Sequence, residues 1–98
     1  MDYNASFSCD KDDGNRLNVW VQNNGDNPVY LNVKWSKFFG LISNEYESVK
    51  IEGDGGSHTI TFYYEDGSGI GGNWDINVTT KVGNELNINV SARQYQIN

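Results

Sequence analysis

Residues 17–35 read LNVWVQNNGDNPVYLNVKW, and they decide the fold because apolar and polar side chains alternate on both sides of a turn. In the first half, every second residue from Leu17 to Val21 is aliphatic, and the same alternation runs from Val29 to Trp35 in the second half. A period of two residues is typical of a half-buried β-strand. Between the halves, the Asn24-Gly25 pair supplies the positive φ angles of a tight turn. The stretch therefore predicts two strands, each with one apolar face.

The same alternation recurs along the rest of the 98-residue chain. Its apolar positions form five further runs: Tyr3, Ala5, Phe7 and Cys9; Val49 and Ile51; Ile60, Phe62 and Tyr64; Trp74, Ile76 and Val78; and Leu86, Ile88 and Val90. Pairs such as Asp13-Gly14 and Asp66-Gly67 separate the runs and suit hairpin turns. An extra strand is expected at 38–42 and a tail strand at 95–97, and a helical turn fits only 43–48. The pattern predicts an all-β, antiparallel β-sandwich of seven to eight strands that forms one domain over residues 1–98.

Composition excludes several classes of function. The formal net charge is −6 and the seven Lys and Arg residues are scattered, so binding to nucleic acid or to an anionic membrane is disfavoured. Cys9 is the only cysteine, so no internal disulfide is expected. No apolar run suits a signal peptide or a membrane span.

Trp20 is the most informative single residue. It alternates with the aliphatic positions of its run, so it points away from the core together with Asn18 and Gln22. An outward indole among amides suits carbohydrate binding, because sugars stack on a flat apolar surface and amides hydrogen-bond their hydroxyls. Tyr30 and Tyr63 also fall on outward positions, and they extend this surface if their strands lie beside that of Trp20. In the alternative, a loop or the N-terminal strand covers Trp20.

Residues 35–42, WSKFFGLI, are too apolar for an ordinary turn. If the segment is exposed, it is an interaction edge or it inserts into a membrane, and its contact residues are Phe38, Phe39 and Leu41. If it folds back, it forms a short crossing strand over the end of the sandwich, which the rarity of large exposed apolar patches favours. Trp35 itself, like Trp74, is in register with aliphatic residues and is expected in the core.

An acidic loop at 10–15, DKDDGN, offers oxygen ligands of the kind that calcium prefers. The candidate metal ligands are Asp10, Asp12, Asp13 and Asn15. The match to an EF-hand loop is partial, because no Glu stands at the twelfth position and no flanking helices are expected. A solvated acidic turn is the alternative, and no other cofactor is expected.

The sequence carries no signature of catalysis. Cys9 and His58 have the chemistry of a nucleophile and a base, but both fall on expected strands without a local motif. No set of titratable residues converges on an evident pocket, so the chain is not expected to be an enzyme.

Residues 17–35 are similar to strands B and C of bacterial immunoglobulin-like modules, in which two alternating strands flank an Asn-Gly turn. Residues 56–78 resemble their strands E and F, and the likeness extends from Leu17 to Val90. The Cys…Trp…Cys arrangement of antibody domains is absent. The resemblance implies an immunoglobulin-like sandwich that acts as a spacer, an adhesion unit or a carbohydrate-binding appendage of an exported protein.

Residues 35–40, WSKFFG, are also similar to an aromatic segment of the aegerolysins, which are acidic β-sandwich proteins that bind membrane lipids. The functional prediction is a non-catalytic binding or adhesion module, secreted or at the cell surface, whose partner is a carbohydrate or another protein. Its ligand-binding residues are Trp20, Tyr30, Tyr63, Asn18 and Gln22. The alternatives are a structural spacer or protein-interaction domain, and a lipid-binding sandwich that acts through its aromatic segment. The oligomeric state stays open.

Overall fold

The computed structural model describes residues 2–37, 40, 42–83 and 85–98, without the side chains of Tyr46 and Glu47. This part of the chain contains seven strands and no helix. The strands are β1 (Asp2–Cys9), β2 (Arg16–Asn23), β3 (Val29–Lys37), β4 (Ile42–Ile51), β5 (Gly56–Phe62), β6 (Gly72–Thr79) and β7 (Ile88–Tyr95). The all-β class predicted from the alternation is confirmed.

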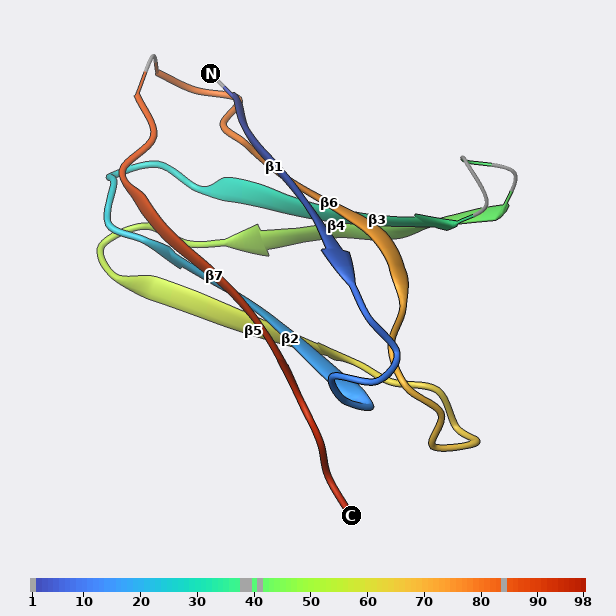
Figure 1. Ribbon diagram of the computed structural model, residues 1–98. Coiled ribbons are helices and arrows are strands. Elements are labelled where there is room, and N and C mark those ends of the chain that lie inside the picture. The colour runs from blue at the N-terminus through green and yellow to red at the C-terminus, as the bar shows by residue number, and fades with distance from the viewer. Residues whose placement is uncertain (1, 38–39, 41, 84) are drawn as a thin grey trace.

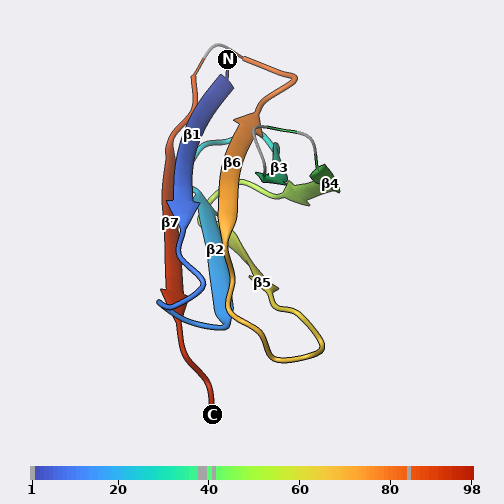
Figure 2. The same ribbon diagram turned by 45° about the vertical axis from the view of Figure 1, so that its right-hand side comes forward.

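The strands form two antiparallel sheets that pack face to face (Figure 1). One sheet has the order β1-β6-β3-β4, and the other has the order β5-β2-β7. The pairs β3·β4, β2·β5 and β1·β6 are nested, as in a long two-stranded ribbon that folds over on itself. The turned view shows β1 and β6 side by side, with β2 and β7 in the other layer (Figure 2). The predicted antiparallel β-sandwich is therefore confirmed.

The Asn-Gly and Asp-Gly turns do not form hairpins, which corrects the prediction for those pairs. Within the described residues, β3 and β4 are the only strands adjacent in sequence that pair with each other. The turn after β2 instead carries the chain into the opposite sheet, and the buried side chain of Asn23 organises it. The Asn23 amide donates to the carbonyls of Asn27 and Ile51 at 2.8 and 3.1 Å, and it accepts the Gly25 N–H at 3.0 Å. A side chain that occupies the backbone groups of the turn in this way releases them from a hairpin ladder.

Three local expectations differ from the structure. Residues 43–48 are not a helical turn, because they lie in β4. Residue 95 ends β7 and does not begin a separate strand. The extra strand expected at 38–42 falls mainly on residues 38, 39 and 41, which lie outside the described residues, and Ile42 opens β4.

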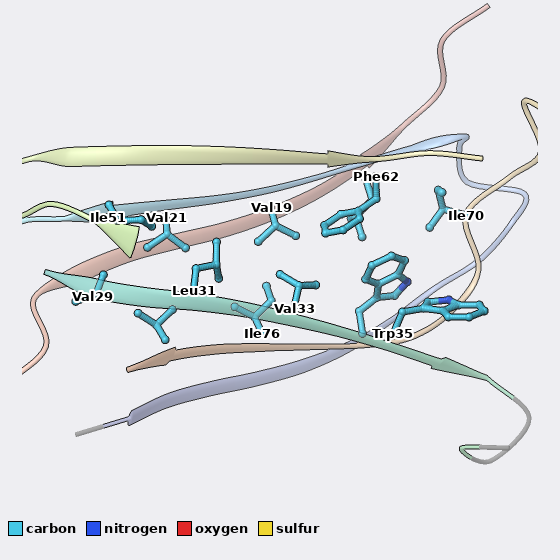
Figure 3. Packing of buried hydrophobic residues seen from close by; sticks show 13 residues of the cluster. Val19, Val21, Val29, Leu31, Val33, Trp35, Ile51, Phe62, Ile70 and Ile76 are labelled. Atoms are coloured by element: carbon cyan, nitrogen blue, oxygen red, sulfur yellow. The ribbon is translucent and has the colours of Figure 1, made fainter. Parts of the chain in front are cut away.

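Among the described residues, thirteen buried apolar side chains fill the space between the sheets (Figure 3). Along most of its length this core is aliphatic, with Val19 and Val21 of β2 opposite Leu31 and Val33 of β3. One end is aromatic. There, the Trp74 ring lies 5.0 Å from that of Phe62 and 6.5 Å from that of Trp35. The core positions predicted for the two tryptophans are confirmed, since Trp35 is 7% exposed and Trp74 is 2% exposed.

The aromatic end is closed by two of the loops that join the sheets, the β1–β2 loop and the β5–β6 loop. Gln94 points inward from β7, and its Nε2 lies 2.8–3.0 Å from the carbonyl oxygens of Asp10, Gly14 and Ile70. The close approach of the loops requires glycine, because a Cβ at Gly69 would lie 1.8 Å from the Lys11 carbonyl oxygen. These contacts fix the β1–β2 loop and the β5–β6 loop against the end of β7.

Candidate ligand-binding face

The outer face of the three-stranded sheet carries a regular grid of side chains, which we call the Trp20 face. The central strand is β2, and every second residue of it points outward. Antiparallel pairing places one residue of the β5 segment and one residue of β7 beside each outward residue of β2. The four rows are Tyr63–Arg16–Tyr95, Thr61–Asn18–Arg93, Thr59–Trp20–Ser91 and Ser57–Gln22–Asn89.

Trp20 lies in the third row of this face and is half-buried. Its cross-strand neighbours Thr59 and Ser91 are small, so no large side chain flanks the indole in its row. The N-terminal strand, which was one candidate cover for Trp20, lies in the other sheet as β1. The indole N–H has no hydrogen-bond partner among the described residues. An aromatic ring and a donor are therefore available at the centre of a polar surface.

The amides on either side of Trp20 have their oxygens occupied and their nitrogens available. The Oδ1 atom of Asn18 accepts the hydroxyls of Thr61 at 2.7 Å and Tyr95 at 3.2 Å. The Oε1 atom of Gln22 accepts the Asn89 amide at 3.1 Å. Neither Asn18 Nδ2 nor Gln22 Nε2 has an acceptor in the part of the chain that the structure describes. These bonds orient both amides and leave their N–H groups as donors for a ligand.

Two arginines stack on the tyrosines of the Trp20 face. The Arg16 guanidinium carbon lies 4.6 Å from the centroid of the Tyr63 ring, and that of Arg93 lies 5.5 Å from the Tyr95 ring. Distances below about 6 Å allow a favourable cation–π interaction. Arg16 also donates from Nη1 to the Asn15 carbonyl at 3.1 Å. The stacked pairs therefore fix a cationic end on this face.

Of the residues predicted for the ligand site, the structure brings Trp20, Asn18, Gln22 and Tyr63 onto one surface and leaves Tyr30 out. Tyr30 is on β3 in the four-stranded sheet, so it faces the opposite side of the sandwich. There, the Lys81 ammonium lies 4.4 Å from the centroid of its ring. The condition for Tyr30 to extend the surface, a strand beside that of Trp20, is not met.

Strand β7 contributes one side of the Trp20 face, which the apolar runs of the sequence do not predict. Its outward residues are Asn89, Ser91, Arg93 and Tyr95, whereas the apolar run of this strand ends at Val90. The alternation continues beyond Val90 with Ala92 and Gln94 at the inward positions, and a small and a polar residue there hide the signal.

A cleft of about 280 Å³ opens beside Tyr63 at the aromatic end of the sandwich. Aromatic rings of both sheets and of the β5–β6 loop line most of it: Trp35, Phe62, Tyr63, Tyr64 and Trp74. The indole N–H groups of Trp35 and Trp74 both donate to the Gly71 carbonyl at 3.0 Å. These donors are committed to the fold, so the cleft offers a ligand apolar surface but few oriented polar groups.

The acidic loop does not gather its carboxylates into a metal-binding group. Asp10 Oδ1 accepts the backbone N–H of Asp12 at 2.9 Å, and the Asp10 carbonyl accepts the N–H of Asp13 at 2.9 Å. Asn15 is buried, and its amide exchanges two hydrogen bonds of 2.9 Å with the backbone of Ile97. Over the described residues, no three His, Cys, Asp or Glu side chains lie close enough to hold a metal ion. The structure gives the calcium prediction no support.

Cys9 and His58 are separated by the architecture. Cys9 ends β1 at one edge of the four-stranded sheet, whereas His58 is on β5 at one edge of the other sheet. Burial, with a smaller contribution from Asp13, raises the pKa of the Cys9 thiol. A raised pKa keeps the thiol protonated at neutral pH, which makes it a weak nucleophile.

The aromatic segment proposed for interaction or lipid binding falls on Phe38, Phe39 and Leu41, which lie outside the described residues. No helix in the described part of the chain is long and apolar enough to cross a membrane.

The fold and this face together define a two-sheet antiparallel β-sandwich with one polar, aromatic-centred outer surface. Compared with protein-family models, with curated proteins and with solved structures, the chain has no match.

Proposed function

We propose that the protein is a non-catalytic binding module that takes a carbohydrate on the Trp20 face. The observation that carries this proposal is the half-buried indole of Trp20 between two small hydroxyl residues, Thr59 and Ser91. A sugar ring needs a flat apolar surface for its C–H groups and hydrogen-bonding groups around that surface for its hydroxyls. The free amide N–H groups of Asn18 and Gln22 lie one row away on each side.

Rigidity of the face supports the same proposal. Asn18 is held by two hydroxyl donors and Gln22 by one amide donor, so neither side chain has to be ordered when a ligand binds. Preorganised polar groups lose less conformational entropy on binding, which favours affinity for a small, weakly apolar ligand such as a saccharide.

The proposed setting is an exported or cell-surface protein in which this sandwich is an immunoglobulin-like adhesion or binding unit. Strands β2 to β6 follow the sheet assignment of immunoglobulin strands B, C, C′, E and F, with β2 and β5 in one sheet and β6, β3 and β4 in the other. The outer strands differ, since β1 pairs with β6 and β7 pairs with β2. The likeness is therefore one of the central five strands.

The test is retention of the protein on a panel of insoluble polysaccharides, with Trp20→Thr as the variant. Threonine keeps a strand-forming residue at this position and removes the indole. We expect retention to weaken at least about tenfold, which corresponds to roughly 1.4 kcal/mol. Tyr30→Thr is the matched control, because it removes an outward aromatic residue from the opposite face. Equal retention of both variants and the parent protein, or no retention on any polysaccharide, would contradict the proposal and leave a spacer or protein-interaction domain.

A further inference from the structure

The Trp20 face differs in charge from the rest of the molecule. The whole chain has a formal net charge of −6. The four rows of the face contain two arginines and no aspartate or glutamate. The face is therefore cationic on a strongly acidic protein.

The two arginines have no charge partner within the described residues. The ion pair found among these residues joins Lys50 and Glu52, at 3.2 Å, and it lies away from the Trp20 face. Arg16 and Arg93 instead contact tyrosine rings, which leaves their positive charge uncompensated. The acidic loop at 10–15 leads directly into Arg16, whereas Arg93 lies one row further along the face and is exposed. Arg93 is thus the better placed of the two to meet an anionic group.

The nitrogen groups around Trp20 favour a ligand that offers acceptors. The amide oxygens of Asn18 and Gln22 are occupied by protein donors, so these two side chains and the Trp20 indole present N–H donors. The hydroxyls of Ser57, Thr59 and Ser91 can donate or accept, and the Asn89 amide oxygen can accept, which suits the hydroxyls of a sugar. A carboxylate offers two acceptors in a geometry that matches the guanidinium fork.

We propose that the saccharide which the Trp20 face takes is acidic, a uronic-acid polysaccharide whose carboxylates pair with Arg93 while a sugar ring stacks on Trp20. This inference rests on the proposed carbohydrate function and specifies its ligand class. Arg93 lies diagonally next to Trp20 across one strand pair, because Arg93 is opposite Asn18 and Ser91 is opposite Trp20. Diagonal neighbours in a sheet are about 7–8 Å apart, which is within the span of a monosaccharide and its carboxylate.

The experiment compares two forms of one polysaccharide, polygalacturonate and its methyl ester, by affinity electrophoresis at low ionic strength. The ester has the same backbone without the charge. We expect polygalacturonate to bind at least about tenfold more tightly than the ester, and this preference to shrink as salt screens the arginines. Arg93→Gln should weaken polygalacturonate binding about tenfold and so remove most of its preference over the ester. The affinity of Arg93→Lys for polygalacturonate should lie between those of the parent protein and Arg93→Gln. Lysine keeps the positive charge but lacks the two parallel N–H donors of the guanidinium.

Lys34→Gln is the matched control, since Lys34 is an exposed cation on the outer face of the four-stranded sheet, and it should change neither affinity. Equal Trp20-dependent binding of polygalacturonate and its ester would overturn this inference while the carbohydrate function stands. Absence of binding to either form, and to neutral polysaccharides, would overturn both. Tighter binding of dextran sulfate or of single-stranded DNA than of polygalacturonate would also overturn it, and would identify sulfate groups or stacked bases as the ligand.

Discussion

The outer faces of the two sheets are built from similar side chains and use them differently. On the four-stranded sheet, polar groups bond from strand to strand: Ser48 donates to Asn32, Asn32 donates to Asn77, and Asn77 donates to Asn4. The row beside it is tied by a hydrogen bond from Ser6 to Asp75, and the next by one from Ser8 to Asn73. These polar side chains therefore hydrogen-bond to one another.

On the Trp20 face, the hydrogen bonds converge on two amide oxygens of the central strand and leave the amide nitrogens without acceptors among the described residues. It also holds an indole in the middle, whereas the outward tyrosine of the other face lies at a corner under Lys81. A polar sheet face is therefore better recognised as a candidate site by the hydrogen-bonding groups that it leaves unpaired than by its amino-acid composition.

The largest effect on stability is expected at Gln94, which holds the β1–β2 and β5–β6 loops together. Replacing Gln94 by Leu removes the donor shared by the carbonyls of Asp10, Gly14 and Ile70, and the bonds to Gly14 and Ile70 are partly buried. Leaving a buried acceptor unsatisfied costs about 1–3 kcal/mol, and here two partly buried carbonyls lose their donor, so we expect Gln94→Leu to lower the free energy of unfolding by about 2 kcal/mol.

Denaturation with urea measures this loss, and Gln96→Leu is the control. Gln96 is exposed and its amide donates only to the neighbouring Ile97 carbonyl, at 3.0 Å. Equal midpoints for the two variants would show that the Gln94 contacts do not hold the loops.

A smaller effect separates the two faces directly. Asn77 joins Asn4 and Asn32 in the middle of the four-stranded sheet, with distances of 2.7 and 3.3 Å. Asn89 makes one bond, to Gln22, at the edge of the Trp20 face. We expect Asn77→Ala to lower the free energy of unfolding by about 1 kcal/mol and Asn89→Ala by less than about 0.5 kcal/mol. Since both changes replace asparagine by alanine in a strand, the difference in strand propensity cancels; a reversed order would contradict the contrast.

Alternation along the chain was sufficient for the sandwich because each strand has to bury one face, and residues such as Leu31 and Val78 occupy that face in the structure. The helical turn predicted at 43–48 was wrong. A register shift between Leu31 and Val33 offsets the pairing of β4 with β3, and this irregularity breaks the alternation that would have marked a strand. The turn residues did not predict which strands pair with each other. A glycine permits a sharp turn between two strands of one sheet and between strands of different sheets alike.

The candidate site was predicted only in part, because local alternation does not reveal which strands are neighbours. Outward parity on one strand is a local property, and it correctly grouped Trp20 with Asn18 and Gln22. Which strands lie beside that strand is a property of the whole fold. Tyr30 was therefore assigned to a surface on the opposite side, and Arg93 was missed although it lies one row from Trp20.

The charge contrast between the faces predicts a difference in fluorescence quenching. Trp20 is half-buried, whereas Trp35 and Trp74 are at most 7% exposed, so a soluble quencher reaches mainly Trp20. Arg16 and Arg93 should attract iodide and repel caesium, and we expect iodide to quench roughly twofold more efficiently at low ionic strength. Arg93→Gln should reduce this difference and Lys34→Gln should not. Equal quenching by the two ions in the parent protein would remove the evidence for a cationic face.

The smallest effect is expected in the β5–β6 loop, which connects the two sheets outside both faces. The Ser68 hydroxyl donates to Asp66 Oδ1 at 2.6 Å and the Ser68 N–H donates to the same oxygen at 2.9 Å, and together they lower the pKa of Asp66. A lowered pKa in the folded state adds stability above the unfolded pKa, and that stability is lost as the pH falls through the folded value, below about pH 4. Because Asp66 is fully exposed, we expect the change in titration and no resolvable change in unfolding. In an NMR titration, Ser68→Ala should raise the pKa of Asp66 part of the way to its ordinary value, since the backbone donor remains. Ser68→Thr keeps the hydroxyl and should leave the pKa low, and an identical pKa in the alanine variant would show that the hydroxyl bond does not persist in solution.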